Sequence, residues 1–208
     1  MVKQERAART RQALIQAAAG VFAEEGFVTA SLSTISGRAG VSNGALHFHF
    51  ANKSMLADAV EAAAAEAVRQ ITEAAQGRQG TALQAVVDAT HELMNGLATD
   101  IVLRGGFELA GDNTRRRESS LRAHWQRWVE DTLRRAQDEG ALAEGVSWAD
   151  AAQIIVAVTA GFEVLGGDDP SWLSPQSITR FWEVILPCLA GPQGANRLMS
   201  AGSRSLPQ

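Results

Sequence analysis

The stretch Ser31–Phe50, SLSTISGRAGVSNGALHFHF, constrains the fold more than any other part of the sequence. It predicts two short helices, at about residues 32–39 and 43–50, joined by a tight turn. Ser42 is a residue type favoured at a helix N-cap, where its hydroxyl accepts from a free backbone N–H group. Gly40 stands just past the first helix, where a left-handed conformation is least costly for glycine. The pattern indicates a helix-turn-helix pair.

The second of these helices is predicted to present polar side chains on its outer surface. Apolar residues at helical spacing can hold the pair together, which leaves Ser42, Asn43 and His47 facing outward. A short, capped helix braced from behind is the form that enters the major groove of DNA. The alternative is a plain helical hairpin inside a soluble bundle, because the pattern alone does not separate the two.

The segment AGVSNGALHFHFANKSML resembles the recognition segment of the TetR family of bacterial repressors, A-G-V-[S/T]-x-G-[A/S]-[L/I]-Y-x-H-F-x-x-K-x-x-L. The matching positions are Gly40, Val41, Ser42, Gly44, Ala45, Leu46, His49, Phe50, Lys53 and Leu56. Two positions depart from the pattern. His47 stands where the family has a phosphate-contacting tyrosine, and Asn43 stands where similar members tend to have lysine.

This resemblance implies an all-α fold with a three-helix, DNA-binding head on a helical body for ligand binding and dimerisation. The expected DNA contacts are Ser33, Ser42, Asn43, Gly44, His47, His49 and Lys53. Asn43 is the best candidate for reading a base, because asparagine pairs well with adenine. His47 and Lys53 are expected to hold phosphates, which set register and not sequence. The implied partner is a near-palindromic operator in double-stranded DNA, bound by a homodimer.

The charge distribution fits such a head. The 208 residues carry a net charge of −4, yet residues 1–54 hold six Lys or Arg and only three Asp or Glu. A basic module on an acidic body is typical of a DNA-binding domain joined to a domain with another role, although a basic terminus can also merely be solvated. The single Cys188 excludes an internal disulfide. No apolar run approaches the roughly 20 residues of a membrane span, and no signal sequence is recognisable, so we expect a cytoplasmic protein without a membrane partner.

Helical periodicity continues to about residue 190 without β alternation, and about nine helices are expected. Their predicted ranges are 8–25, 32–39, 43–50, 53–75, 81–97, 100–110, 115–139, 148–165 and 175–190. We assign residues 1–52 to the DNA-binding domain, 53–190 to the ligand-binding and dimerisation domain, and 191–208 to a disordered tail. Residues 1–7 are expected to form a mobile basic arm.

The last two predicted helices are the candidate dimer interface. The helix at 148–165 is apolar nearly all round and must be covered on both sides. The expected dimerisation residues are Ile155, Phe162, Phe181, Trp182 and Ile185. In the alternative, both helices fill the core of a monomer.

A ligand site is expected around Trp125. The segment from Trp125 to Gly167, including the later G-x-x-V-x-G-G string, is similar to the γ-butyrolactone receptor branch of the family. That resemblance implies that Trp125 lines a pocket for a small lactone and that Thr159 can hydrogen-bond it. The full expected set is Leu121, Trp125, Trp128, Val129, Thr159 and Phe162. Alternatively, the tryptophans are core residues and Thr159 bonds to its own helix carbonyl.

No pattern supports catalysis or a metal site. His91-Glu92 resembles the start of a zinc-protease motif, but position 95 is Asn, so the second ligand is missing. We therefore expect no enzyme activity, cofactor or metal. The sequence predicts a repressor released by a lactone- or furan-type signal. A regulator of another apolar ligand, such as a drug or fatty acyl compound, and a ligand-blind pseudo-receptor are the alternatives.

Overall fold

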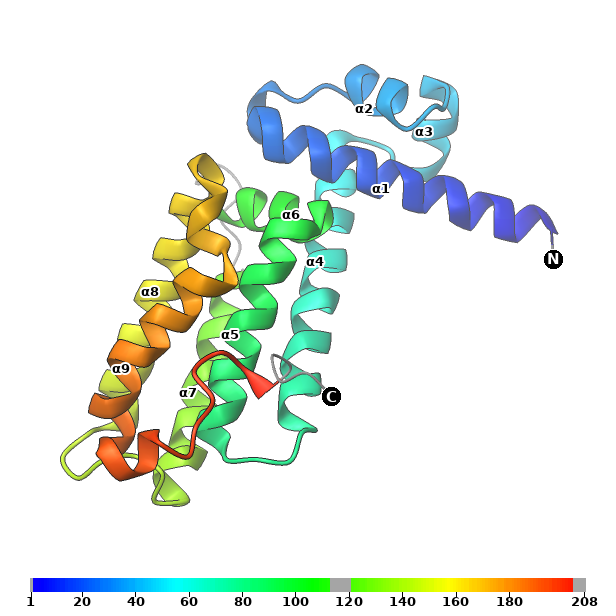
Figure 1. Cartoon of the computed structure of the whole chain (residues 1–208). Coiled ribbons are helices and arrows are strands. Elements are labelled where there is room, and N and C mark those ends of the chain that lie inside the picture. Colours follow the sequence, from blue (N-terminus) through cyan, green and yellow to red (C-terminus); the bar gives the residue numbers. More distant parts are fainter. Residues whose placement is uncertain (1, 113–120, 204–208) are drawn as a thin grey trace. The chain divides into compact units, whose positions relative to one another are not determined.

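The computed structural model describes residues 2–112 and 121–203, and within them the regular structure is entirely helical (Figure 1). These residues form nine α-helices and one short 3₁₀ helix: α1 Val2–Thr29, α2 Leu32–Arg38, α3 Asn43–His49, α4 Lys53–Gln76, α5 Ala82–Thr99, α6 Ile101–Gly111, α7 Leu121–Asp138, α8 Trp148–Asp168, η2 Pro170–Leu173 and α9 Pro175–Ala195. The predicted all-α fold with a helical head and body is confirmed. The residues 115–120 that we expected at the start of α7 lie outside the described part.

The chain divides into two compact units, and the division differs from the expected boundary at residue 52. The first unit comprises Met1–Ala67 and Asp100–Leu121, and the second comprises Val68–Thr99 and Arg122–Gln208. Helix α4 therefore contributes its first part to one unit and its last part to the other. Helix α6, which we had placed in the body, belongs to the first unit because it packs on α1.

The two ends of the chain also differ from expectation. Helix α1 begins at Val2, so residues 2–7 are helical and do not form a separate arm. Helix α9 continues to Ala195, and the segment beyond it lies against α5. There Gln84 exchanges two hydrogen bonds with Met199, of 2.8 and 3.2 Å, and His91 Nε2 lies 2.8 Å from the Ser200 carbonyl oxygen. Ordered contacts to Ser203 contradict the expected disorder for these residues; residues 204–208 lie outside the described part.

Asp88 on α5 is the buried anchor of this C-terminal segment. Its carboxylate accepts from the backbone N–H of Ser203 at 2.9 Å, from the Ser203 hydroxyl, and from Gln84 Nε2 at 2.8 Å. Arg78 Nη1 approaches the same carboxylate at 3.2 Å. Burial favours the neutral acid and raises the pKa of Asp88, but these donors outweigh it and hold the pKa below its ordinary value.

Close helix packing in the first unit depends on the pair Gly105-Gly106. A Cβ on Gly105 would lie 2.5 Å from the carbonyl oxygen of Ala19 on α1, and one on Gly106 would lie 2.3 Å from the Cβ of Ala64 on α4. The missing side chains let α6 approach both helices at backbone distance. The sequence showed the two glycines, but not which helices they meet.

We therefore predict that Gly105→Ala destabilises the protein by about 1–3 kcal/mol, because the new methyl group overlaps backbone atoms that cannot move aside. The matched control is Gly37→Ala on α2, where a Cβ would meet nothing within 4 Å. There alanine should be neutral or stabilising by up to about 1 kcal/mol. Urea unfolding followed by circular dichroism measures both changes. Equal stabilities of the two variants would contradict the close packing of α6.

Candidate functional site

The predicted helix-turn-helix pair is present as α2 and α3. The Ser42 hydroxyl caps α3 by accepting from the backbone N–H of Ala45 at 3.2 Å, and Gly40 has the left-handed φ of 67° that the turn requires. Ser31 caps α2 in the same way, through Thr34 at 3.0 Å. Ile35 and Leu46 are fully buried between the helices. Each helix of the pair thus begins at a capping serine, and buried apolar residues hold the two helices together.

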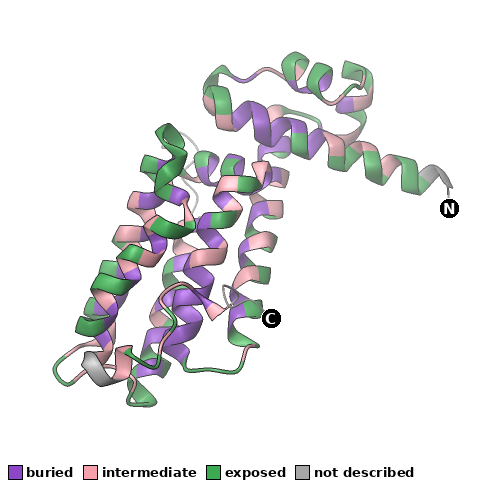
Figure 2. Ribbon diagram, in the orientation of Figure 1, coloured by how far each residue is buried: buried purple, intermediate pink, exposed green. Residues whose placement is uncertain are grey.

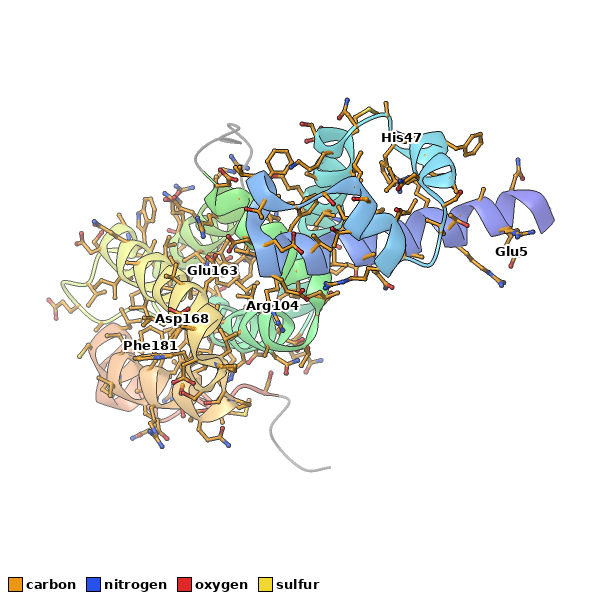
Figure 3. All side chains as sticks on the ribbon, turned by 90° about the horizontal axis from the view of Figure 1, so that it is seen from above. Glu5, His47, Arg104, Glu163, Asp168 and Phe181 are labelled. Carbon is orange, nitrogen blue, oxygen red and sulfur yellow. The ribbon has the colours of Figure 1, made fainter. Side chains whose placement is uncertain are left out.

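The expected polar residues of α3 lie at the surface. Ser33, Ser42, Asn43, Gly44 and His47 are exposed, while His49 is half-buried. Figure 2 colours the ribbon by burial, and Figure 3 labels His47. A Cβ on Gly44 would meet only the Ser42 hydroxyl, at 3.9 Å, so the surface beside this glycine is open to an approaching partner. Of the residues expected to face DNA, Asn43, Gly44, His47 and His49 lie on α3 and Ser42 caps it, whereas Ser33 lies on α2 and Lys53 on α4.

Asn43 is less free than the sequence suggested. Its side-chain amide lies 2.5 Å from the hydroxyl of Ser36, a buried residue of α2, and that hydroxyl also lies 3.1 Å from the Ser33 carbonyl oxygen. One atom of the Asn43 amide head is therefore engaged within the protein. Paired recognition of adenine uses both head atoms, so Asn43 meets a base through the other atom unless the bond to Ser36 is released.

Lys53 has a different role from the expected phosphate contact. Its ammonium group donates to the backbone carbonyl oxygens of Phe27, Val28 and Ala30, at 2.7, 3.0 and 2.8 Å. It also lies 4.7 Å from the centre of the Phe27 ring. Because an ammonium group has three N–H donors, these carbonyls use all of them. Lys53 fastens the start of α4 to the end of α1.

Phe48 is a surface residue that the sequence analysis missed. It is 82% exposed on α3, and its ring packs edge-on against that of His49 at 5.2 Å. Helical geometry points it almost directly away from the buried Leu46 and Phe50. The missed signal was its position, since the residue four places after Gly44 shares the outer face of the helix.

In the second unit, Trp125 and Thr159, two of the residues expected to contact a ligand, bond to each other. Trp125 Nε1 donates to the Thr159 hydroxyl oxygen at 3.0 Å, and that hydroxyl donates to the Val156 carbonyl oxygen at 3.0 Å. Both residues are buried. The hydroxyl is thus satisfied by its own helix and by the indole, so the bond to the helix carbonyl that we considered as an alternative is present.

Trp128 extends this group toward the end of α4. Its ring stacks on Trp125 with centroids 5.4 Å apart and planes 24° apart. Its Nε1 lies 2.7 Å from the side-chain amide of Gln76, and Arg135 Nη2 lies 3.2 Å from the same amide. Indole and guanidinium groups only donate, so Gln76 presents its oxygen to both.

The remaining expected ligand residues fall in different places. Val129 is fully buried on α7, and Phe162 on α8 packs edge-on against Phe181 of α9 at 5.9 Å. Leu121 belongs to the first unit, where its Cδ1 lies 3.2 Å from the position of a Cβ on Gly106. In the described structure, Trp125, Trp128 and Thr159 lie together in the second unit. Leu121 belongs to the first unit and is not part of this group.

The expected dimerisation residues need correction. Ile155 and Trp182 are fully buried in the single chain, and Phe162 is nearly so, so they form its core. Phe181, labelled in Figure 3, and Ile185 are half-buried. The apolar side chains left exposed on the two helices are Ile154, Val164 and Leu165 on α8 and Val184 on α9, with exposures of 45%, 63%, 44% and 71%.

Helix α8 also departs from the expectation that no segment approaches a membrane span. Among the described helices, it alone is long and apolar enough to cross a membrane by length and composition, and 33% of its apolar window is buried. Its buried residues, such as Ile155, Thr159 and Phe162, share one side of the helix. The apolar character thus comes from two faces, one in the core and one exposed.

Comparisons with known proteins agree with this geometry. Residues 14–60 match the tetR family of bacterial regulatory proteins. The chain is 29% identical over 196 residues to the A-factor receptor protein of Streptomyces griseus, covering 92% of this chain and 68% of that protein. It is similar to a crystal structure of a γ-butyrolactone receptor, an ArpA-like protein, with a TM-score of 0.83, 26% identity and coverage of 96% and 97% of the two chains. The TetR family protein CprB from Streptomyces coelicolor, in complex with its biological operator sequence, gives a TM-score of 0.81 with the same identity and coverage.

The contacts of Lys53 lead to a prediction about stability. Lys53→Met keeps the stem but removes the donors, so the protein should lose about 1–3 kcal/mol of unfolding free energy. Arg127→Met, at an exposed cation of α7, is the control and should change stability by less than about 0.5 kcal/mol. Thermal and urea unfolding provide the measurement. If Lys53 instead held a phosphate, Lys53→Met would leave stability unchanged and lower the salt dependence of DNA binding.

Proposed function

We propose that this chain, whose residues 14–60 match the tetR family of bacterial regulatory proteins, is a homodimeric transcriptional repressor that a small lactone releases from DNA. The observation that carries the proposal is the exposed polar surface of α3. The helix pair that presents it is capped, and the buried residues Ile35 and Leu46 hold the pair together. Control of genes requires access to the chromosome, so the proposal includes a cytoplasmic location.

The proposed DNA contacts are those of the outer surface of α3. Gly44 allows close approach of the backbone, and Ser42, Asn43 and His47 supply polar groups beside it. Ser33 and His49 flank this surface, and Phe48 can meet an apolar thymine methyl group. Two such heads on a two-fold axis fit a near-palindromic operator with half-sites about one helical turn, roughly 34 Å, apart or a multiple of that.

The proposed dimer interface is the exposed apolar face of α8 together with Val184 of α9. At 100° per residue, Gly161 lies at the centre of the face that contains Ile154, Val164 and Leu165. A Cβ on Gly161 would meet nothing within 4 Å in its own chain. Glycine inside a helix costs about 1 kcal/mol relative to alanine. Close approach by a second copy gives this glycine a role.

The proposed ligand is a γ-butyrolactone or related furan with an alkyl tail. The names of the A-factor receptor and of the γ-butyrolactone receptor point to this class. A lactone carbonyl accepts hydrogen bonds but cannot donate them. It therefore suits the Trp125 indole N–H, for which it would compete with the Thr159 hydroxyl. A drug or fatty acyl ligand, or no ligand at all, remains the alternative to be tested.

The central test is an electrophoretic shift on the DNA upstream of the protein's own gene, with and without lactones of graded tail length. We expect a shift that one or more lactones abolish. Trp125→Phe, which keeps a stacked ring but loses the N–H donor, should weaken lactone binding about tenfold. Its affinity for DNA should stay unchanged. Lactone-insensitive binding would identify a ligand-blind regulator, and the absence of any shift would contradict the proposed DNA site.

The dimer interface gives a separate prediction. Gly161→Leu should convert the dimer to a folded monomer, because the new side chain fills the space that the second copy needs. Operator affinity should fall with it. Gly167→Leu is the matched control, since Gly167 is exposed on the same helix but lies about 120° away around its axis. Analytical ultracentrifugation measures the mass. A Gly161→Leu protein that remains a dimer would place the interface elsewhere.

A further inference from the structure

We propose that Gln76 couples the ligand site to the DNA-binding helices, through its hydrogen bond with Trp128. The inference rests on the proposed function and adds to it the route by which a ligand acts. A continuous set of contacts carries it: Thr159 bonds to Trp125, Trp125 stacks on Trp128, and Trp128 bonds to Gln76. Each contact lies within the second unit.

The position of Gln76 makes this contact mechanically important. It is the last residue of α4, an unbroken helix of 24 residues and so about 36 Å long. At the other end of the same helix, Lys53 is bonded to three carbonyl oxygens at the end of α1. Helix α4 therefore joins the residue that bonds Trp128 to the unit that contains α3.

The chemistry of the bond makes it responsive to the ligand. A ligand that takes the Trp125 N–H from Thr159 moves the Trp125 ring, and the ring stacked on it must move too. The Trp128 N–H points at a single acceptor, and a hydrogen bond weakens steeply when its angle departs from linearity. The Gln76 bond thus favours the arrangement of α4 that goes with the unliganded tryptophan stack.

The partners of Gln76 allow a coupling role to be separated from a purely structural one. Arg135 Nη2 shares the Gln76 oxygen but also reaches the Thr132 hydroxyl at 3.2 Å, so it keeps a partner when Gln76 is replaced. Gln76 itself is exposed, so its replacement leaves no cavity. The substitution Gln76→Leu removes the side-chain amide and with it the acceptor for the Trp128 N–H.

The test measures operator affinity of the full-length protein with and without a lactone, and lactone affinity with and without operator. The lactone is the member of the graded series that changes the tryptophan fluorescence of the unaltered protein most. Gln76→Leu should bind operator more weakly than the unaltered protein when lactone is absent, because the DNA-binding arrangement of α4 has lost this bond, and it should bind lactone no more weakly. The factor by which lactone weakens operator binding should fall about tenfold or more, since a dimer loses two such bonds. By linkage, operator should weaken lactone binding by the same reduced factor.

Two further variants sharpen the result. Trp128→Phe keeps the stack but loses the N–H, so it should reduce the effect of lactone on operator binding as Gln76→Leu does. The double variant should reduce that effect little further. Gln79→Leu, an exposed glutamine three residues beyond α4, is the matched control and should couple normally. If lactone releases the Gln76→Leu protein from operator as readily as it releases the unaltered protein, or more readily, the proposal is overturned. If the unaltered protein binds no operator or ignores every lactone, the proposed function has failed first.

Discussion

The three hydrogen bonds of Lys53 are the contact on which the arrangement of the first unit depends. An ammonium group at the start of α4 gathers three carbonyl oxygens at the end of α1, where the helix is broken by Gly26 and the chain turns toward α2. Free carbonyls at a helix end need donors, and here the donor belongs to the helix that leads to the second unit. Helices α1 and α4 are thereby joined, and α6 closes on both through Gly105 and Gly106.

The parts of this structure that could be predicted from sequence are those decided by neighbours in the chain. The cap at Ser42, the left-handed turn at Gly40 and the helix periodicity each depend on residues within one or two turns. The role of Lys53 could not be predicted, because its acceptors lie 23 to 26 residues away. The bond between Ser36 and Asn43 crosses from one helix to the next and was hidden for the same reason.

Helices α8 and α9 show a second limit of prediction from sequence. Composition does not show which of two apolar faces of a helix lies in the core. Helix α8 is apolar nearly all round, so its periodicity could not show which face joins the core. The structure places Ile155 and Phe162 inside and leaves Ile154 and Val164 exposed. Three of the expected dimerisation residues, Ile155, Phe162 and Trp182, are therefore core residues. In the proposed dimer, Gly161 is the better signal, because it lies at the centre of the exposed apolar face of α8.

Energetics set a bound on what the contact between Gln76 and Trp128 can do. Moving a repressor from mostly bound to mostly released requires about 5 kcal/mol of differential ligand affinity. A hydrogen bond of this kind contributes about 1 kcal/mol net, so two in a dimer supply less than half of the requirement. The remainder must come from other contacts that differ between the two arrangements. The tryptophan stack is the nearest source, because Trp125 and Trp128 lie on one helix, α7, and stack on each other. The helix that holds the stack thus acts together with the bond to Gln76.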